Sequence, residues 1–217
     1  MKNHKILKTA VGLSALLPLV LALFFYTKVS GPVPIHWNAL GQADSWGSRS
    51  CLFYVPAFTL LLTAVMAVLP RIDPRRESRL YHSAVYLKIM LVMNLFFGVV
   101  QLQSILGGLR AGRQGVDLFL LSLCLLFMVL GNFLPKCSHN YFVGIRTPWT
   151  LASPDCWRRT HRLAGVLWVA CGIAGTLSVL SLPKGAASVL CAGLFTAAAV
   201  IPVGYSLLFF HTRARHN

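Results

Sequence analysis

The sequence predicts an all-α integral membrane protein with six transmembrane helices and both termini in the cytoplasm. Of its 217 residues, 56% are hydrophobic and 12% are charged, whereas soluble proteins average about 25% charged residues. The apolar residues fall into six segments, each long enough at about 18–25 residues to cross the hydrocarbon core of a bilayer. The net charge of +15 would suggest nucleic acid in a soluble protein. In a membrane protein it indicates a positive-inside bias and contact with anionic membrane lipids, with no direct nucleic-acid partner.

The first predicted helix spans residues 9–26, after a basic start with Lys2, Lys5 and Lys8. A cleaved secretory signal has a shorter apolar core of about 7–15 residues and a small-residue cleavage site, so we expect an uncleaved helix that Pro18 kinks. Residues 28–51 form a polar loop, in which several Pro and Gly residues exclude a long helix and two Trp residues suit a membrane interface.

The five remaining spans are read from their apolar runs and from the turn residues between them. We expect them at residues 52–69, 85–106, 116–134 and 186–210, with the fifth span continuing from the helix that starts near Pro154 to about residue 182. On the third predicted helix, Asn94, Gly98 and Gln101 are spaced so that they form one polar stripe, which predicts that this stripe faces the interior of the bundle.

The orientation follows from the distribution of Lys and Arg. With the N-terminus inside, 15 of these 20 residues lie in cytoplasmic segments and five lie outside. This bias predicts two cytoplasmic termini. The basic RIDPRRESR turn and the polar segment 131–165 then face the cytoplasm, and the loop 28–51 faces out.

The chain divides into two three-helix halves, residues 1–113 and 114–217, which we expect to pack as one bundle. Because three is odd, the halves cross the membrane in opposite directions, as inverted repeats do in many transporters. Each half also has its long loop after its first helix. The spacings within these loops differ, however, so coincidence is the preferred interpretation.

Segment 131–165 is the main candidate site, because it concentrates polar and aromatic side chains between apolar helices, where polar groups must be solvated or paired. Ser153, Pro154 and Asp155 predict a helix start within it. The candidate residues are Asn132, Pro135, Lys136, Asn140, Gly144, Arg146, Thr147, Pro148, Trp149, Thr150, Trp157, Thr160, His161 and Arg162.

The spacing of these residues, from Gly131-Asn132 through Gly144-Ile145-Arg146-Thr147-Pro148-Trp149-Thr150 to Gly165, resembles the SdpI family. These bacterial membrane proteins are known for immunity to a secreted toxic peptide. A second pattern resembles the N-terminal domain of unknown function that often accompanies the family. It consists of Pro34, His36, Trp37, Asn38, Gly41 and Asp44.

The resemblance implies a multi-pass protein of the bacterial cytoplasmic membrane that binds a toxic peptide at its outer loop and bundle. It further implies that the cytoplasmic segment signals or locks the protein, and, because a known member of the family sequesters a cytoplasmic repressor, it suggests such a repressor as a second partner. Two alternatives remain open. One is a membrane enzyme or lipid-headgroup binder that uses the basic segment, and the other is a small exporter.

The chemistry of the sequence disfavours catalysis and ion-coupled transport. No Asp or Glu lies in the middle of a predicted span, where coupled carriers place an ionisable group. Lys136, Arg146, Arg158 and Arg162 could cradle a phosphate, but cations that reach for lipid headgroups are the simpler interpretation.

No metal or cofactor is expected. The spacing of Cys137, His139, Cys156 and His161 is not a recognised zinc pattern, and His36 with Asp44 supplies too few ligands for a cation.

Overall fold

The computed structural model of the protein describes residues 2–38, 42–109 and 118–214. Within these residues, six helices are long and apolar enough to cross a membrane, which confirms the six predicted spans. Shorter helical segments adjoin them: η1 (Arg49–Phe53) precedes the second, η2 (Leu134–Lys136) extends the fourth, and α5 (Pro148–Ala152) lies before the fifth. The six spanning helices are α1 (Lys2–Phe25), α2 (Tyr54–Ile72), α3 (Ala84–Leu109), α4 (Leu118–Phe133), α6 (Pro154–Ser181) and α7 (Lys184–Ala214).

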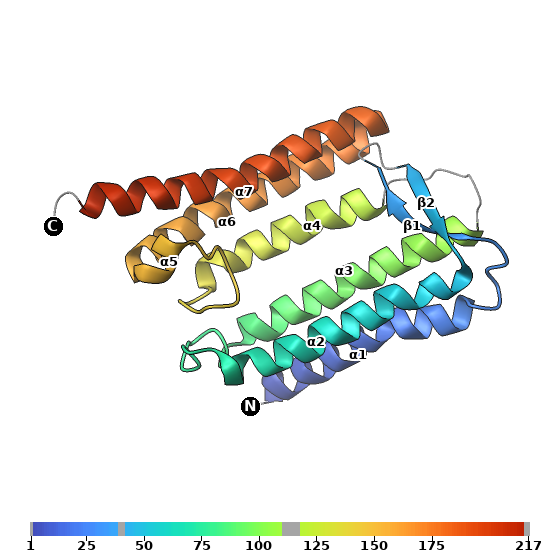
Figure 1. Ribbon diagram of the computed structural model, residues 1–217, viewed down its shortest axis with the longest axis horizontal. Helices are drawn as coiled ribbons and strands as arrows, with labels where there is room; N and C mark the ends of the chain where they lie inside the picture. Colours follow the sequence, from blue (N-terminus) through green and yellow to red (C-terminus); the bar gives the residue numbers. More distant parts are fainter. Residues whose placement is uncertain (1, 39–41, 110–117, 215–217) are drawn as a thin grey trace.

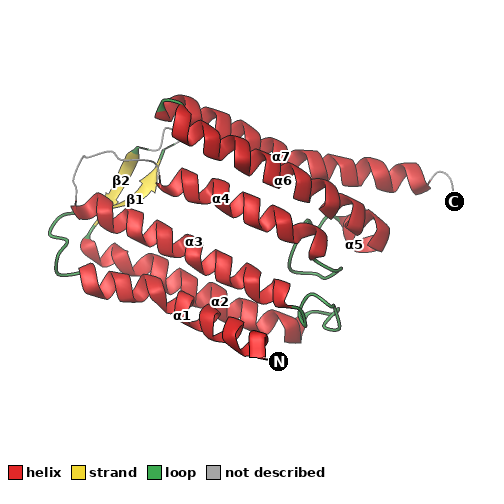
Figure 2. Cartoon of the chain, turned by 180° about the vertical axis from the view of Figure 1, so that it is seen from behind, coloured by secondary structure: helices red, strands yellow, loops and turns green. Residues whose placement is uncertain are grey.

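The helices lie roughly parallel in two groups, α1–α3 and α4, α6 and α7, which meet where α3 packs against α4 (Figure 1). The beginning of α1, the end of α7 and the polar segment 131–165 lie at one end of the molecule. Both ends of the chain therefore approach the same side, as an even number of spans requires. Seen from behind, the only strands of the described residues lie at the opposite end (Figure 2).

The polar loop 28–51 contains an element that the sequence analysis did not predict. Strands β1 (Val33–Trp37) and β2 (Ala43–Gly47) form an antiparallel hairpin, whose register is irregular around His36. Asn38 braces the turn, because its side-chain oxygen accepts a hydrogen bond from the Gln42 N–H at 3.0 Å. The hairpin is fixed to α3, where the Ser104 hydroxyl donates to the carbonyl of Pro34 at 3.0 Å.

The polar stripe of α3 faces the interior, as its spacing predicted. Asn94 is 1% exposed and joins three helices. Its amide nitrogen donates to the carbonyl of Val11 at 3.2 Å and to Ser14 Oγ at 3.3 Å, both on α1, while its oxygen accepts from Thr63 Oγ1 on α2 at 2.9 Å. Interhelical hydrogen bonds of this kind satisfy polar groups that lipid cannot.

The two halves are packed differently. In the first half, α1 contacts both α2 and α3, whereas in the second half α6 lies between α4 and α7 and contacts both. A first helix packed closely on a third therefore occurs in only one half, which favours coincidence over an internal repeat. The expected boundary between residues 113 and 114 lies outside the described residues.

Candidate functional site

Segment 131–165 folds as one module from the end of α4 to the first turns of α6. Its two ends are held together by glycines, because Gly131 on α4 and Gly165 on α6 face each other. A Cβ on Gly165 would lie 2.8 Å from the Gly131 carbonyl oxygen, and a Cβ on Gly131 would lie 3.0 Å from that of Gly165. Close backbone approach of two helices in a membrane requires such small residues.

The loop between η2 and α5 is organised around Asn140, which is completely buried. Its side-chain oxygen accepts hydrogen bonds from the N–H groups of Phe142 and Val143 at 2.9 and 2.7 Å. Its amide nitrogen donates to the carbonyls of Ser138 and Val143, both at 2.9 Å. One side chain thus satisfies four backbone groups of a turn that has no regular secondary structure.

His161 of α6 holds the next turn of this loop. Its Nε2 accepts the Ile145 N–H at 3.0 Å, so its proton lies on Nδ1, which donates to the Trp157 carbonyl at 2.8 Å. The ring leaves no room beside Gly144, whose φ is +122° and whose added Cβ would lie 2.2 Å from Nε2. The position therefore requires glycine.

Trp157 completes this packing. It is 1% exposed, stacks on His161 with ring centroids 4.0 Å apart, and donates its indole N–H to the carbonyl of Cys137 at 2.8 Å. Trp157, His161 and Ala164 are buried, and Trp168 donates to the carbonyl of Ala198 on α7 at 3.0 Å. These four residues occupy the single helical face on which their spacing places them.

Two threonines start α5. The hydroxyl of Thr147 accepts from the Thr150 N–H at 3.2 Å, and Thr150 Oγ1 accepts from the Thr147 N–H at 2.8 Å, a reciprocal cap with Pro148 in the first turn. Thr150 also donates to the carbonyl of Ile145 at 2.8 Å. Trp149 and Thr147 both hydrogen-bond to Ser206, which docks α5 on α7.

The start of α6 is as the sequence predicted. Ser153 Oγ caps the helix by accepting from the Cys156 N–H at 3.3 Å, and Pro154 occupies the first turn. Asp155 pairs with Arg158 at 3.1 Å and with Arg159 at 3.4 Å on the exposed face. Thr160, one turn further, is completely buried.

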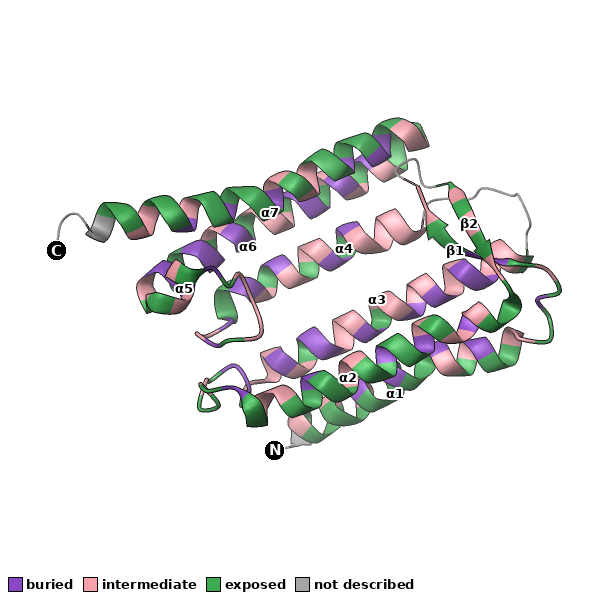
Figure 3. Ribbon diagram, in the orientation of Figure 1, coloured by how far each residue is buried: buried purple, intermediate pink, exposed green. Residues whose placement is uncertain are grey.

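The remaining candidates lie on the surface of the module and are not gathered into one cluster. Figure 3 shows exposed and buried residues alternating along this part of the chain. Arg146 donates one hydrogen bond to the Tyr141 carbonyl at 3.2 Å, and Lys136 reaches Asn132 Oδ1 at 3.5 Å. Asn132, Pro135, Lys136, Arg146, Pro148 and Arg162 are exposed.

The sequence analysis missed Asp73, which lies in the turn that it interpreted only as basic. Asp73 is 2% exposed and receives hydrogen bonds from the N–H groups of Arg75 at 2.7 Å and Tyr141 at 3.0 Å, and from the hydroxyl of Tyr81. Tyr141 belongs to the second half of the chain, so this carboxylate joins the halves. Its one sequence signal was its position as an acid within a strongly basic turn.

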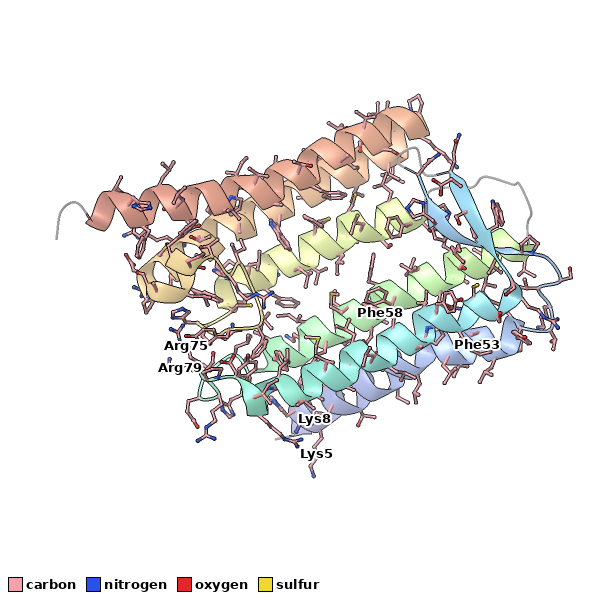
Figure 4. The ribbon with its side chains drawn as sticks, in the orientation of Figure 1. Lys5, Lys8, Phe53, Phe58, Arg75 and Arg79 are labelled. Atoms are coloured by element: carbon pink, nitrogen blue, oxygen red, sulfur yellow. The ribbon has the colours of Figure 1, made fainter. Side chains whose placement is uncertain are left out.

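Other side chains of residues 73–83 also hold the module. Arg75 donates to the carbonyl of Leu151 at 3.1 Å, and its guanidinium lies 4.8 Å from the ring centroid of Tyr141. Ser138 Oγ accepts from the Leu80 N–H at 2.8 Å. Figure 4 places Arg75 and Arg79 at the same end of the molecule as Lys5 and Lys8 of α1.

Three titratable groups near this junction are held in their neutral forms. Burial, together with the charge of Arg75, lowers the pKa of His139, so its imidazole is neutral at pH 7. Burial and the carboxylate of Asp73 raise the pKa of Tyr81, so its hydroxyl remains a donor. Burial likewise raises the pKa of the Cys137 thiol to about 12.

The potential zinc set is not assembled. Both ring nitrogens of His161 are used by backbone groups, and the Cys137 thiol donates to the Phe133 carbonyl at 3.4 Å. Among the described residues, no three His, Cys, Asp or Glu side chains lie close enough together to hold a metal ion.

The hairpin residues form a second candidate surface at the opposite end of the molecule. His36 Nδ1 and Asp44 Oδ1 lie 2.6 Å apart across the strands, and both side chains are exposed. Trp37 stacks on Phe119 of α4 at 6.4 Å, and Pro34 is buried. Gly41 lies outside the described residues. The two predicted sets of site residues therefore do not form a common site.

Comparisons with known proteins cover both candidate regions. Residues 136–206 match the model of the SdpI/YfhL protein family, and residues 13–60 match that of a domain of unknown function, DUF1648. The chain is similar to the immunity protein SdpI of Bacillus subtilis (strain 168), with 25% identity over 186 residues, which are 85% of this chain and 84% of that protein. No solved structure matches.

Proposed function

We propose that this chain, which matches the SdpI/YfhL family model over residues 136–206 and is similar to an immunity protein, is itself an immunity protein, which protects a bacterial membrane by binding a toxic peptide. The similarity to an immunity protein along most of both chains supports this role. The observation that supports a binding mechanism is that buried polar side chains of the module already have hydrogen-bond partners within it. The polar atoms of Asn140, His161 and Thr150 are hydrogen-bonded to backbone groups of the module itself. Such side chains hold a shape and are not poised to react.

The hairpin is the surface that we assign to first contact with the peptide. It exposes Ile35 and Trp46, 44% and 45% accessible, beside the polar pair His36 and Asp44. An aromatic and an aliphatic side chain next to polar groups suit an amphipathic peptide at a membrane interface. Through Ser104 and Trp37 the same hairpin is attached to α3 and α4, one from each half.

The module at the other end is proposed as a lock between the halves and as the surface for a cytoplasmic partner, such as a repressor. Among its exposed cations, Arg146 uses one N–H on the Tyr141 carbonyl. A guanidinium carries five N–H donors in a planar fork, so Arg146 keeps donors for paired hydrogen bonds to a partner's carboxylate or carbonyl groups.

The second candidate function is binding of anionic lipid headgroups, and the basic end of the molecule favours it. Lys5, Lys8 and Arg79 lie at the same end as the module, and Lys136 and Arg162 are exposed. Each cation near an anionic surface contributes about 1 kcal/mol of attraction, which depends on charge and not on the shape of the side chain.

Replacement of Arg146 by Lys separates these two functions. We expect Arg146→Lys to abolish protection of cells against the secreted toxic peptide associated with this family, at an unchanged amount of protein in the membrane. Lys keeps the charge but cannot make paired, planar hydrogen bonds. Arg76→Lys, in an exposed position of the same end, is the matched control and should protect fully. Full protection by Arg146→Lys would assign the residue to headgroup attraction.

Both proposed surfaces require cytoplasmic termini and an external hairpin. Cys51 is the one cysteine of the chain that is not buried, so a Cys51→Ser background leaves no accessible thiol. In that background, we expect a cysteine at Ala43 of β2 to react with a membrane-impermeant maleimide on intact cells, and reporter tags on both termini to indicate the cytoplasm. Labelling that needs permeabilised cells would reverse the assignment of the two surfaces.

A further inference from the structure

Gln101 of α3 is buried in the membrane-spanning part of the first half without using its amide. It is 0% exposed, and neither its Nε2 nor its Oε1 has a hydrogen-bond partner among the described residues. Asn94, two helical turns away on the same stripe, uses both amide atoms on α1 and α2. Polar groups without partners are strongly disfavoured in hydrocarbon, so the two amides of this stripe have different roles.

The neighbours of Gln101 on α1 can be placed from the contacts on either side. Toward the start of α3, Asn94 hydrogen-bonds to Ser14 of α1. Toward the end of α3, Ile105 packs in one cluster with Ala22 of α1. Pro18, on the same buried stripe of α1, therefore lies level with Gln101. A proline has no N–H, so the carbonyl of Ser14 cannot receive its usual helical hydrogen bond.

The hydroxyl groups nearby are already used. Thr63 bonds Asn94, and one turn further along α2 the buried Thr59 donates to the carbonyl of Val55 at 2.7 Å. One turn beyond Gln101 on α3, the hydroxyl of Ser104 donates to the Pro34 carbonyl of the hairpin. This level of the bundle thus has an unused donor and acceptor on Gln101, and the Ser14 carbonyl without its helical donor lies toward the level of Asn94.

We propose that this level is a binding site for one neutral group that both donates and accepts a hydrogen bond: the amide of a peptide that enters beneath the hairpin. A water molecule, which has the same hydrogen-bonding chemistry, holds the place when no peptide is bound. A primary amide carries no charge, and no Asp, Glu, Lys or Arg lies on α3 between Lys88 and the end of the helix. The site therefore selects a neutral group, because an ion would be buried without a counter-charge.

This inference rests on the proposed immunity function and gives the ligand a second contact, below the hairpin. Ser104 connects the two, since it lies one turn from Gln101 and holds β1. A peptide that displaces the strand from Ser104 would reach the Gln101 amide next.

The first test needs no ligand. Gln101→Met removes the amide while keeping a flexible side chain of similar length, and Asn94→Leu is the matched control. In detergent, we expect Gln101→Met to leave the midpoint of thermal unfolding unchanged or to raise it, and Asn94→Leu to lower it by several degrees. A membrane protein of this size shifts by about 2–4 °C per lost interaction of moderate strength. A midpoint lowered equally in both variants, or a Gln101→Met protein that fails to accumulate, would show that the amide is paired with other groups of the protein at rest, which contradicts a free site.

The second test adds the secreted toxic peptide of the family to the purified proteins. The wild-type protein should gain thermal stability with peptide, and Gln101→Met should lose most of that gain together with protection in cells. An equal gain in both proteins would mean that only water occupies the site, which overturns this inference and leaves the immunity function intact. If wild-type cells are not protected, the proposed function itself is wrong.

Discussion

We expect Asn140→Ala to abolish protection and to lower the amount of folded protein in the membrane. The substitution removes four hydrogen bonds from a fully buried side chain. It leaves backbone N–H groups of Phe142 and Val143 without their acceptor. Each buried donor that loses its partner costs about 1–3 kcal/mol, so we expect a loss on the order of 3–5 kcal/mol in the free energy of unfolding. Membrane levels and thermal unfolding in detergent measure it.

Asn132→Ala is the matched control for this prediction. Asn132 belongs to the same module but is exposed, and its one described contact is a 3.5 Å approach of Lys136. We expect this variant to accumulate and protect like the wild type. Equal behaviour of the two variants would mean that the loop does not depend on Asn140 for its shape.

Asp73→Ala should separate the two halves at the module end. The carboxylate accepts from Arg75, Tyr81 and Tyr141, and its removal leaves buried donors on both sides of the junction. We expect the thermal midpoint to fall by roughly 5–10 °C, from a loss on the order of 2–4 kcal/mol. Loop 137–147 should become accessible to protease.

Glu77→Ala controls for charge in the same turn, because Glu77 is the other acid there and is exposed. It should leave both the midpoint and the protease pattern unchanged. A stable, protease-resistant Asp73→Ala protein would contradict the assignment of this carboxylate as the junction between the halves.

The sequence predicted those features that depend on neighbouring residues. Apolar length located the six helices, and the Ser153-Pro154 pair located the start of α6. The spacing of Asn94, Gly98 and Gln101 located the buried face of α3. In each case the determining residues lie within a few turns of one another, so the pattern can be read along the chain.

The features that sequence analysis missed depend on contacts between distant segments. Asp73 accepts a hydrogen bond from Tyr141, which lies 68 residues away in the sequence, and no residue close to Asp73 in the sequence indicates this partner. The hairpin was interpreted as a loop because its Pro and Gly residues exclude a helix, although its short aromatic strands are stabilised by packing of Val33 and Pro34 against α3. The stripe on α3 likewise gave no sign that Asn94 would be bonded and Gln101 would not.

The length of α7 has a consequence for how the module is approached from solution. A helix of 31 residues is about 46 Å long at about 1.5 Å per residue, whereas the hydrocarbon core is about 30 Å thick. Tilts of up to about 40° absorb only part of this excess, so the helix extends beyond the hydrocarbon core into the headgroup layer, which brings the bilayer to about 40–45 Å. Figure 1 shows that the C-terminal end of α7 reaches past α5 and the start of α6, on the side of the module. Arg159 of α6 contacts this end of α7, with its guanidinium carbon 5.0 Å from the ring centroid of Phe209. The end of α7 therefore flanks the module at the level of the headgroups, where Ser206 holds α5 against it, and a partner that approaches from the side of α7 meets this helical end first.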